Sequence, residues 1–120
     1  MKASFRGDKG KMTIAEWTKT VHKNAVAHGW WESPRTEGEL LMLVASEIFE
    51  AFEEVRHGKG MTETYYSGDG KMEGIPSELA DVVIRVMDLC GYYGIDLESV
   101  IAEKHAYNLS RPYKHGGKVL

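Results

Sequence analysis

The sequence predicts an all-α protein with a single domain. Three segments repeat their apolar residues at helical spacing, whereas the alternation typical of strands is scarce. Two capping boxes, Thr13-Ile-Ala-Glu16 and Thr36-Glu-Gly-Glu39, predict helix starts, because each threonine accepts a backbone N–H while each glutamate reaches back. The length of 120 residues suits one domain with a modest core.

The first two predicted helices follow these boxes. The first runs from Thr13 to His28 and ends where Gly29 allows a turn. The second and strongest runs from Thr36 to about Arg56. At about 100° per residue, its apolar side chains fill one arc; they are Leu40, Leu41, Val44, Ile48, Ala51, Phe52 and Val55. Along one edge of this arc lie Glu47, Glu50 and Glu54.

Residues 57–75 form the next segment, which is rich in Gly, Thr and Ser. A loop of this length in a compact domain indicates a lid, a binding loop or local disorder. Tyr65 and Tyr66 are the candidates for a lid.

Two further helices complete the predicted domain, which spans residues 13–112. Pro76 suits the first position of the third helix, which ends at Tyr93 before Gly94. Asp96 caps a fourth helix that reaches about Asn108. The third helix also has an acidic edge beside its apolar arc; that edge carries Glu78, Asp81, Arg85 and Asp88. We expect residues 1–12 to be a flexible lead-in and residues 113–120 to be a basic, flexible tail.

Composition and charge exclude several classes of function. A net charge of −3 and a pI near 5.9 argue against a surface for nucleic-acid polymers or membranes. Cys90 is the single cysteine and has no intramolecular disulfide partner. The first residues lack the apolar segment of a signal peptide, and no apolar run approaches the roughly 20 residues that cross a bilayer. We therefore expect a cytoplasmic protein.

Two acidic pairs are the candidate site. Residues three apart lie on the same side of a helix, so Glu47 points with Glu50 and Glu78 points with Asp81. If the two helices are antiparallel neighbours, all four carboxylates converge at the edge of the core. Such a group repels itself unless a cation balances it, and Mg²⁺ prefers oxygen ligands. The alternative is that both pairs are solvated helix faces.

These motifs resemble those of the MazG-like all-α nucleotide pyrophosphohydrolases. Glu47-Ile-Phe-Glu50, residues 51–77 and then Glu78-Leu-Ala-Asp81 look like the ExxE…ExxD signature of that family. The flanking segments also match, over roughly residues 20–118; they include Gly29-Trp30-Trp31-Glu32, Lys104, Tyr107-Asn108 and Arg111-Pro112. The segment between the motifs is near the long end for the family.

The resemblance implies a fold, a reaction and an assembly. The family hydrolyses nucleoside triphosphates between the α and β phosphates, which yields a nucleoside monophosphate and pyrophosphate. The four carboxylates would hold Mg²⁺, with Mn²⁺ as a substitute, and one of them or Glu54 would be the general base. A four-helix MazG-like bundle completed in a homodimer or homotetramer is expected, since these helices alone form a thin core.

The substrate needs cations in addition to the metal. Lys104, Arg111 and Arg85 are the candidate phosphate ligands, and Asn108 is a candidate for phosphate or base. The alternatives are an ion pair of Arg85 with Asp81 one turn earlier, a solvated Lys104, and a helix-end role for Asn108.

Aromatic residues after the first helix are the candidate base ligands. Trp30 and Trp31 could stack on a base, or could equally be packing residues. His22 and Asn24 are expected on the surface, although both could reach a nucleotide.

Three rival functions stay open at this point. A narrower enzyme of the same superfamily, such as a phosphoribosyl-ATP pyrophosphohydrolase or a dUTPase-like protein, would use the same carboxylates. A di-iron bundle needs paired E-x-x-H motifs, of which Glu54-Val-Arg-His57 is the one copy. The third rival is a non-catalytic helical interaction module that metal binding stabilises.

Overall fold

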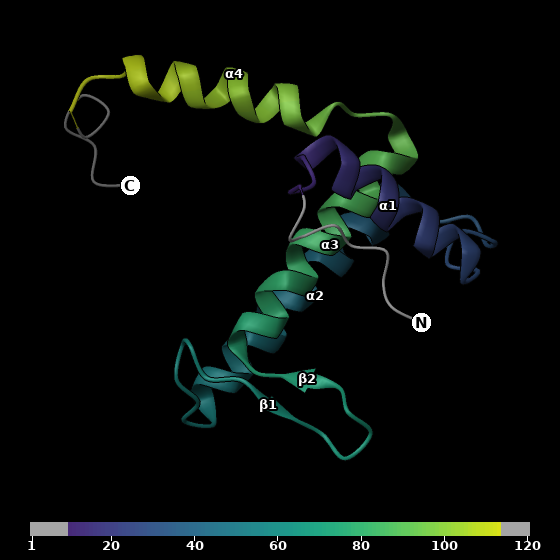
Figure 1. Cartoon of the computed structure of the whole chain (residues 1–120), viewed down its shortest axis with the longest axis vertical. Coiled ribbons are helices and arrows are strands. Elements are labelled where there is room, and N and C mark those ends of the chain that lie inside the picture. Colours follow the sequence, from purple (N-terminus) through teal and green to yellow (C-terminus); the bar gives the residue numbers. More distant parts are fainter. Residues whose placement is uncertain (1–9, 114–120) are drawn as a thin grey trace.

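The protein is built from four helices and one small hairpin (Figure 1). The computed structural model describes residues 10–113. Within this range the elements are α1 (Ile14–Ala27), α2 (Glu37–Arg56), β1 (Tyr65–Tyr66), β2 (Met72–Glu73), α3 (Ile75–Tyr93) and α4 (Leu97–Ser110). The predicted all-α class is therefore confirmed. The predicted lead-in and tail lie outside the described residues, apart from positions 10–12 and 113.

Both predicted capping boxes are present. The Thr13 hydroxyl accepts the N–H of Glu16 at 3.0 Å, and the Glu16 carboxylate accepts the N–H of Thr13 at 2.8 Å. Thr36 and Glu39 repeat this arrangement at the start of α2, at 3.1 and 2.8 Å. These reciprocal bonds satisfy N–H groups that have no partner within the helix.

The ends of α3 and α4 differ from the prediction in small ways. Helix α3 begins at Ile75, so Pro76 lies in its first turn without opening it. Gly94 ends α3 in the left-handed conformation, with φ of 69°. The Asp96 side chain caps α4, as predicted, by accepting the N–H of Ser99 at 3.2 Å.

A two-stranded antiparallel hairpin lies between α2 and α3, within the segment 57–75. Tyr65 pairs with Glu73 and Tyr66 pairs with Met72. Gly74 joins the hairpin to α3 with φ of 114°, and a side chain there would collide with the carbonyl oxygen of Glu63. The hairpin therefore begins where α2 ends and finishes where α3 begins.

Helices α1, α2 and α3 pack together, and α4 leaves them. Helix α3 contacts both α2 and α1, whereas the main neighbour of α4 is α1. The N–H of Ala15 donates to Glu98 at 2.8 Å, which joins α1 to the first turn of α4. Beyond that turn α4 projects away from the other helices (Figure 1). Its residues 98–110 are exposed.

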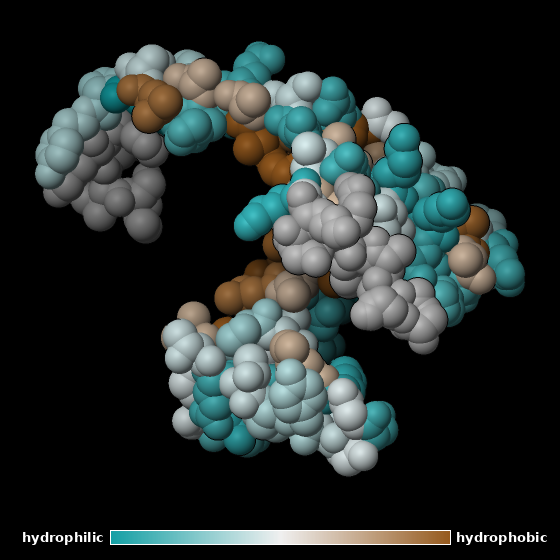
Figure 2. Space-filling model, in the orientation of Figure 1, coloured by the Kyte–Doolittle hydropathy of each residue, from teal (hydrophilic) through white to brown (hydrophobic). Residues whose placement is uncertain are grey.

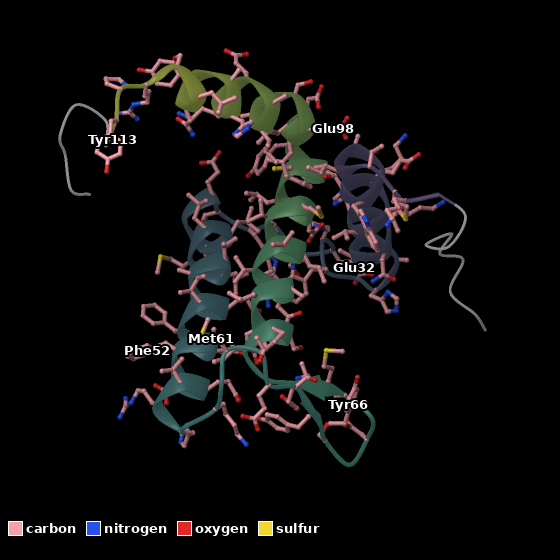
Figure 3. All side chains as sticks on the ribbon, turned by 60° about the vertical axis from the view of Figure 1, so that its left-hand side comes forward. Glu32, Phe52, Met61, Tyr66, Glu98 and Tyr113 are labelled. Atoms are coloured by element: carbon pink, nitrogen blue, oxygen red, sulfur yellow. The ribbon has the colours of Figure 1, made fainter. Side chains whose placement is uncertain are left out.

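The core within one chain is small. Among the described residues, the buried apolar side chains are Leu40, Ala51, Ile75 and Cys90, of which Ile75 is fully buried. Much of the predicted apolar arc of α2 is uncovered: Ala51 is 7% exposed, but its neighbour Phe52 is 55% exposed. Phe52 points away from α3 in Figure 3. Figure 2 shows hydrophobic residues along the hollow that lies between α4 and the hairpin end.

Within residues 10–113, every helix is too short or too polar to span a bilayer.

Close packing of α1 against α3 depends on Gly91. A Cβ added at Gly91 would lie 2.5 Å from Cβ of His22. We expect Gly91→Ala to lower the free energy of unfolding by about 1–3 kcal/mol, the usual effect of overpacking. Urea denaturation measures this change.

Gly38 offers a matched control because it is also helical. An added Cβ there meets nothing closer than the Thr36 hydroxyl at 4.0 Å. Gly38→Ala should therefore stabilise the protein by up to about 1 kcal/mol, the difference in helix propensity. Equal effects of the two substitutions would contradict the close contact between α1 and α3.

Candidate metal centre

Three carboxylates from two helices meet at the α2–α3 contact. Glu47 and Glu50 lie one turn apart on α2, and Glu78 lies in the first turn of α3. One oxygen of each can be chosen so that all three lie within 4.8 Å of one another. Glu47 and Glu78 are buried, whereas Glu50 is exposed. Two buried ligand groups and one exposed group therefore form a site with a solvent-facing side.

Glu78 lacks a partner that its position requires. Its Oε1 is buried and, among the described residues, accepts no hydrogen bond. Burial, together with the charges of Glu50, Asp81 and Glu47, raises the pKa of Glu78 to about 7. A buried anionic oxygen without a donor is costly. A divalent cation would satisfy it, because three carboxylates from neighbouring turns are oxygen ligands of the type that Mg²⁺ takes.

Asp81 lies beside this group without joining it. The set of mutually close oxygens leaves Asp81 out. Burial and the charge of Glu47 nevertheless raise the pKa of Asp81, and the charges of Lys71 and Arg85 oppose that rise. The fourth predicted carboxylate thus shares the electrostatic environment of the other three, at the margin of the cluster.

Arg85 joins the cluster to the aromatic residues. Its Nε donates to Oε2 of Glu47 at 2.6 Å, so its ion pair crosses from α3 to α2. The intrahelical pair with Asp81 that sequence spacing suggested is not the one formed. The guanidinium also lies 5.0 Å from the ring centre of Trp30. Arg85 therefore neutralises part of the acidic charge and lies between the carboxylates and Trp30.

The two tryptophans that follow α1 have different surroundings. Trp30 lies between two guanidinium groups, with that of Arg35 at 4.3 Å from its ring centre. Trp31 stacks on Tyr92 with ring centres 4.0 Å apart and planes 5° from parallel. The indole N–H of Trp31 donates to Asp88 at 2.9 Å. Packing contacts thus occupy Trp31 more fully than Trp30.

His22 and Asp88 form a second buried polar contact that sequence reasoning missed. His22 was expected on the surface, but its Nδ1 lies 2.8 Å from Oδ1 of Asp88. Its side chain is 23% exposed and meets the Trp31 ring edge-on. One feature of the sequence pointed toward this contact: Asp88 continues the face of α3 that carries Glu78, Asp81 and Arg85. The helical wheel identified that face but could not identify its partners on α1.

Glu54, the candidate general base, is held by the hairpin. The Tyr65 hydroxyl donates to both oxygens of Glu54, at 2.9 and 3.1 Å. This bond to Glu54 raises the pKa of Tyr65, which keeps the phenol protonated as a donor. Glu54 therefore fixes the hairpin on α2 at the end of the helix that carries Glu47 and Glu50.

The predicted ligands on α4 are separate from the cluster within this chain. Lys104 and Asn108 are exposed, and the Arg111 guanidinium lies 5.7 Å from the ring centre of Tyr107. Helix α4 extends from the end of α3 opposite the hairpin (Figure 1). One chain thus brings Arg85 and Trp30 near the carboxylates, but does not bring Lys104, Asn108 or Arg111 there.

The geometry does not favour a di-iron site. His57 is the C-cap of α2, and its Nδ1 lies 2.8 Å from the carbonyl oxygen of Glu53. The metal-binding group found within residues 10–113 consists of glutamates alone.

Comparisons with protein-family models, with curated proteins and with solved structures give no match to this chain. The MazG-like resemblance therefore stays an expectation that rests on the motifs quoted above.

The raised pKa of Glu78 makes the metal-free protein sensitive to pH. Between pH 4.5, its ordinary pKa, and about 7, the folded protein keeps a proton that the unfolded chain has lost. Stability in EDTA should therefore fall as pH rises through this window. Urea denaturation from pH 5 to pH 8 measures the fall.

Glu78→Gln is the matched variant, because it keeps the shape and removes the titration. We expect its stability to fall less with pH than that of the unmodified protein. Added Mg²⁺ should stabilise the unmodified protein more at pH 8 than at pH 5, since the ion replaces the proton. Parallel pH curves for the two proteins would contradict the assignment.

Proposed function

We propose that this protein is a Mg²⁺-dependent nucleoside triphosphate pyrophosphohydrolase that cleaves the α–β phosphate bond. Two observations on Glu78 carry the proposal: its buried Oε1 has no hydrogen-bond partner among the described residues, and one of its oxygens lies within 4.8 Å of oxygens from Glu47 and Glu50. The ordered ExxE and ExxD motifs on two adjacent helices support the same reaction. Mn²⁺ is proposed as a substitute for Mg²⁺, and the cytoplasm as the location.

The proposed chemistry divides between the ion and the carboxylates. Bound Mg²⁺ would neutralise phosphate oxygens and lower the pKa of an attacking water. Glu47, Glu50 and Glu78 would hold the ion, Asp81 would add charge beside them, and the exposed Glu50 would face the substrate. A carboxylate accepts the proton of the water as its oxygen bonds to phosphorus. The bond from that phosphorus to the α–β bridging oxygen breaks and its electron pair stays on that oxygen, so the products are a nucleoside monophosphate and pyrophosphate.

There are two candidates for the general base that accepts the proton of the water. Glu54 lies one turn after Glu50, and the Tyr65 hydroxyl holds its carboxylate in one orientation. A carboxylate of the cluster is the alternative. In either case the base is on α2 or α3, so the contact between these helices positions both the ion and the proton acceptor.

Trp30 is the proposed base-stacking residue, and Trp31 is the second candidate. The Arg85 guanidinium lies between Trp30 and Glu47, which puts an aromatic ring and a phosphate-binding cation beside the same carboxylates. Stacking on an indole tolerates different bases, so this arrangement supports several nucleoside triphosphates as substrates.

Homo-oligomerisation is the second part of the proposal. Exposed apolar residues follow the outer sides of α2 and α3; they include Leu41, Ile48, Phe52, Val55, Leu79, Val83 and Ile84. Contiguous apolar surface of this kind is typical of interaction sites. A homodimer or homotetramer would bury it. In the same assembly, the projecting α4 would bring its candidate phosphate ligands to the carboxylate cluster of a neighbouring subunit. These ligands are Lys104, Asn108 and Arg111.

The reaction itself is tested by product analysis. The protein with Mg²⁺ should release pyrophosphate, and not phosphate, from a panel of the canonical nucleotides, dUTP and modified triphosphates. Glu50→Gln should reduce kcat by more than the roughly 10–100-fold typical of lost outer-shell metal partners, and Asp81→Asn should reduce it by about that factor. Circular dichroism should find the helices intact.

Glu53→Gln is the control for both variants, because Glu53 is an exposed α2 carboxylate that pairs with Arg56 on the surface. Its kcat should be unchanged. Normal turnover by Glu50→Gln and Asp81→Asn would exclude the metal assignment. Release of pyrophosphate from a single nucleotide would favour the narrower superfamily enzymes.

The assembly is tested by light scattering on the intact protein. We expect a mass that is a multiple of 13.5 kDa. Phe52→Glu should lower the mass to that of one chain, because it puts a charge on the apolar face of α2. Met61→Glu is the control, since Met61 is 63% exposed but lies after α2. An unchanged mass for Phe52→Glu would place the interface elsewhere.

A further inference from the structure

Arg85 is bonded directly to one carboxylate of the candidate metal centre. Its Nε donates to Oε2 of Glu47 at 2.6 Å, and the Glu47 side chain is 8% exposed. Glu78 is the other buried carboxylate of the cluster, and its buried Oε1 has no hydrogen-bond partner among the described residues. The arginine therefore satisfies one of the two buried glutamates and leaves the other for an ion.

The bond from Arg85 is compatible with a metal ion on the same carboxylate. An ionised carboxylate has two oxygens with about four lone-pair positions, so it can accept an N–H and bind an ion at once. The bond to Oε2 restrains the orientation of the Glu47 carboxylate and leaves its other oxygen for the ion. Carboxylates that bind metals are generally oriented by an outer hydrogen-bond partner of this kind. The guanidinium has five N–H donors, so others stay available for phosphate oxygens.

The segment between α1 and α2 holds Arg85 in this place. Its guanidinium lies 5.0 Å from the ring centre of Trp30, on which the guanidinium of Arg35 also packs, at 4.3 Å. The Nε of Arg35 donates to the carbonyl oxygen of Trp30 at 3.4 Å. Asp81 lies one turn before Arg85, but among the described residues the two form no ion pair within 4.0 Å. The contact with Trp30 therefore accompanies the arrangement in which Arg85 reaches across to Glu47.

We propose that Arg85 is a positioning residue for the metal ion and that Trp30 holds Arg85 in place, an inference that rests on the proposed metal-dependent function. Arg85 orients the Glu47 carboxylate and keeps it ionised in a buried position, so that it is ready to bind Mg²⁺. The alternative is that Arg85 only repels the ion and competes with it for Glu47. Removal of Arg85 would then strengthen Mg²⁺ binding, whereas removal of a positioning residue weakens it. The sign of the change distinguishes the two roles.

Calorimetric titration of the full chain with Mg²⁺ alone measures this sign. Arg85→Gln should weaken Mg²⁺ binding about 10–100-fold, the usual effect of losing an outer hydrogen-bond partner. Arg85→Lys should recover only part of the affinity, because it keeps the charge but loses the planar group that packs on Trp30. Trp30→Ala should weaken binding roughly 2–30-fold, the range of one cation–π contact, and Trp30→Phe should weaken it less. Lost base stacking cannot contribute, since no nucleotide is present.

Arg56→Gln is the charge-matched control, because Arg56 pairs with Glu53 on the exposed surface of α2. Its Mg²⁺ affinity should equal that of the unmodified protein. If circular dichroism finds Arg85→Gln unfolded, Arg85→Lys provides the same comparison, because a role through charge alone predicts unchanged affinity for that variant.

The outcomes separate this inference from the proposed reaction. Unchanged or tighter Mg²⁺ binding in the Arg85 variants would overturn the positioning role, while pyrophosphate release by the unmodified protein would still support the hydrolase. If the unmodified protein cleaves no nucleotide, the hydrolase proposal fails, and weaker Mg²⁺ binding in the variants still supports the positioning role. A chain that binds no Mg²⁺ would overturn both.

Discussion

The gathering of acidic side chains at the α2–α3 contact is the constraint on which the rest of the structure depends. Glu47 and Glu78 are buried within a few ångströms of each other, and the one cation bonded to them in the described chain is Arg85. Burial raises the pKa of Glu78, and so do the charges of the neighbouring carboxylates, which one guanidinium cannot neutralise. The same imbalance is the reason that we propose a bound metal ion at this contact. Stability and function are therefore coupled at this contact, because the group that disfavours folding without the ion is the group that would bind it.

Local features of the fold could be predicted from the sequence because their causes are local. Thr13 and Thr36 each form a capping box with a glutamate three residues later, and Asp96 caps α4. The acidic edges of α2 and α3 also followed from helical spacing, and three of the four predicted carboxylates come together. The partner of Arg85 could not be predicted, since Asp81 on the same helix and Glu47 on the next are equally consistent with the wheel. Their relative distances depend on how the helices are shifted along each other.

The remaining differences also come from long-range packing. His22 lies against Asp88 because Gly91 lets α1 approach α3 closely, and nothing near His22 in the sequence signals that approach. The hairpin strands contain two residues each, which is too few for an alternating pattern to be recognised. The direction of α4 depends on the left-handed Gly94 and the following cap, so helical periodicity carries no information about it. The phosphate ligands predicted on α4 thus lie apart from the carboxylates in one chain.

The hairpin has a consequence for how the segment between the two acidic pairs can change in length. Its two strands are hydrogen-bonded to Glu54 and Ser77, on the two helices that carry the carboxylates. Its tip is an exposed turn that contains Gly68 and Gly70. Residues added or removed at the tip extend or shorten a free end without moving either attachment. The tip is therefore the place where a reporter group, such as a fluorophore or a short epitope, could be introduced with least effect on the arrangement of the four carboxylates.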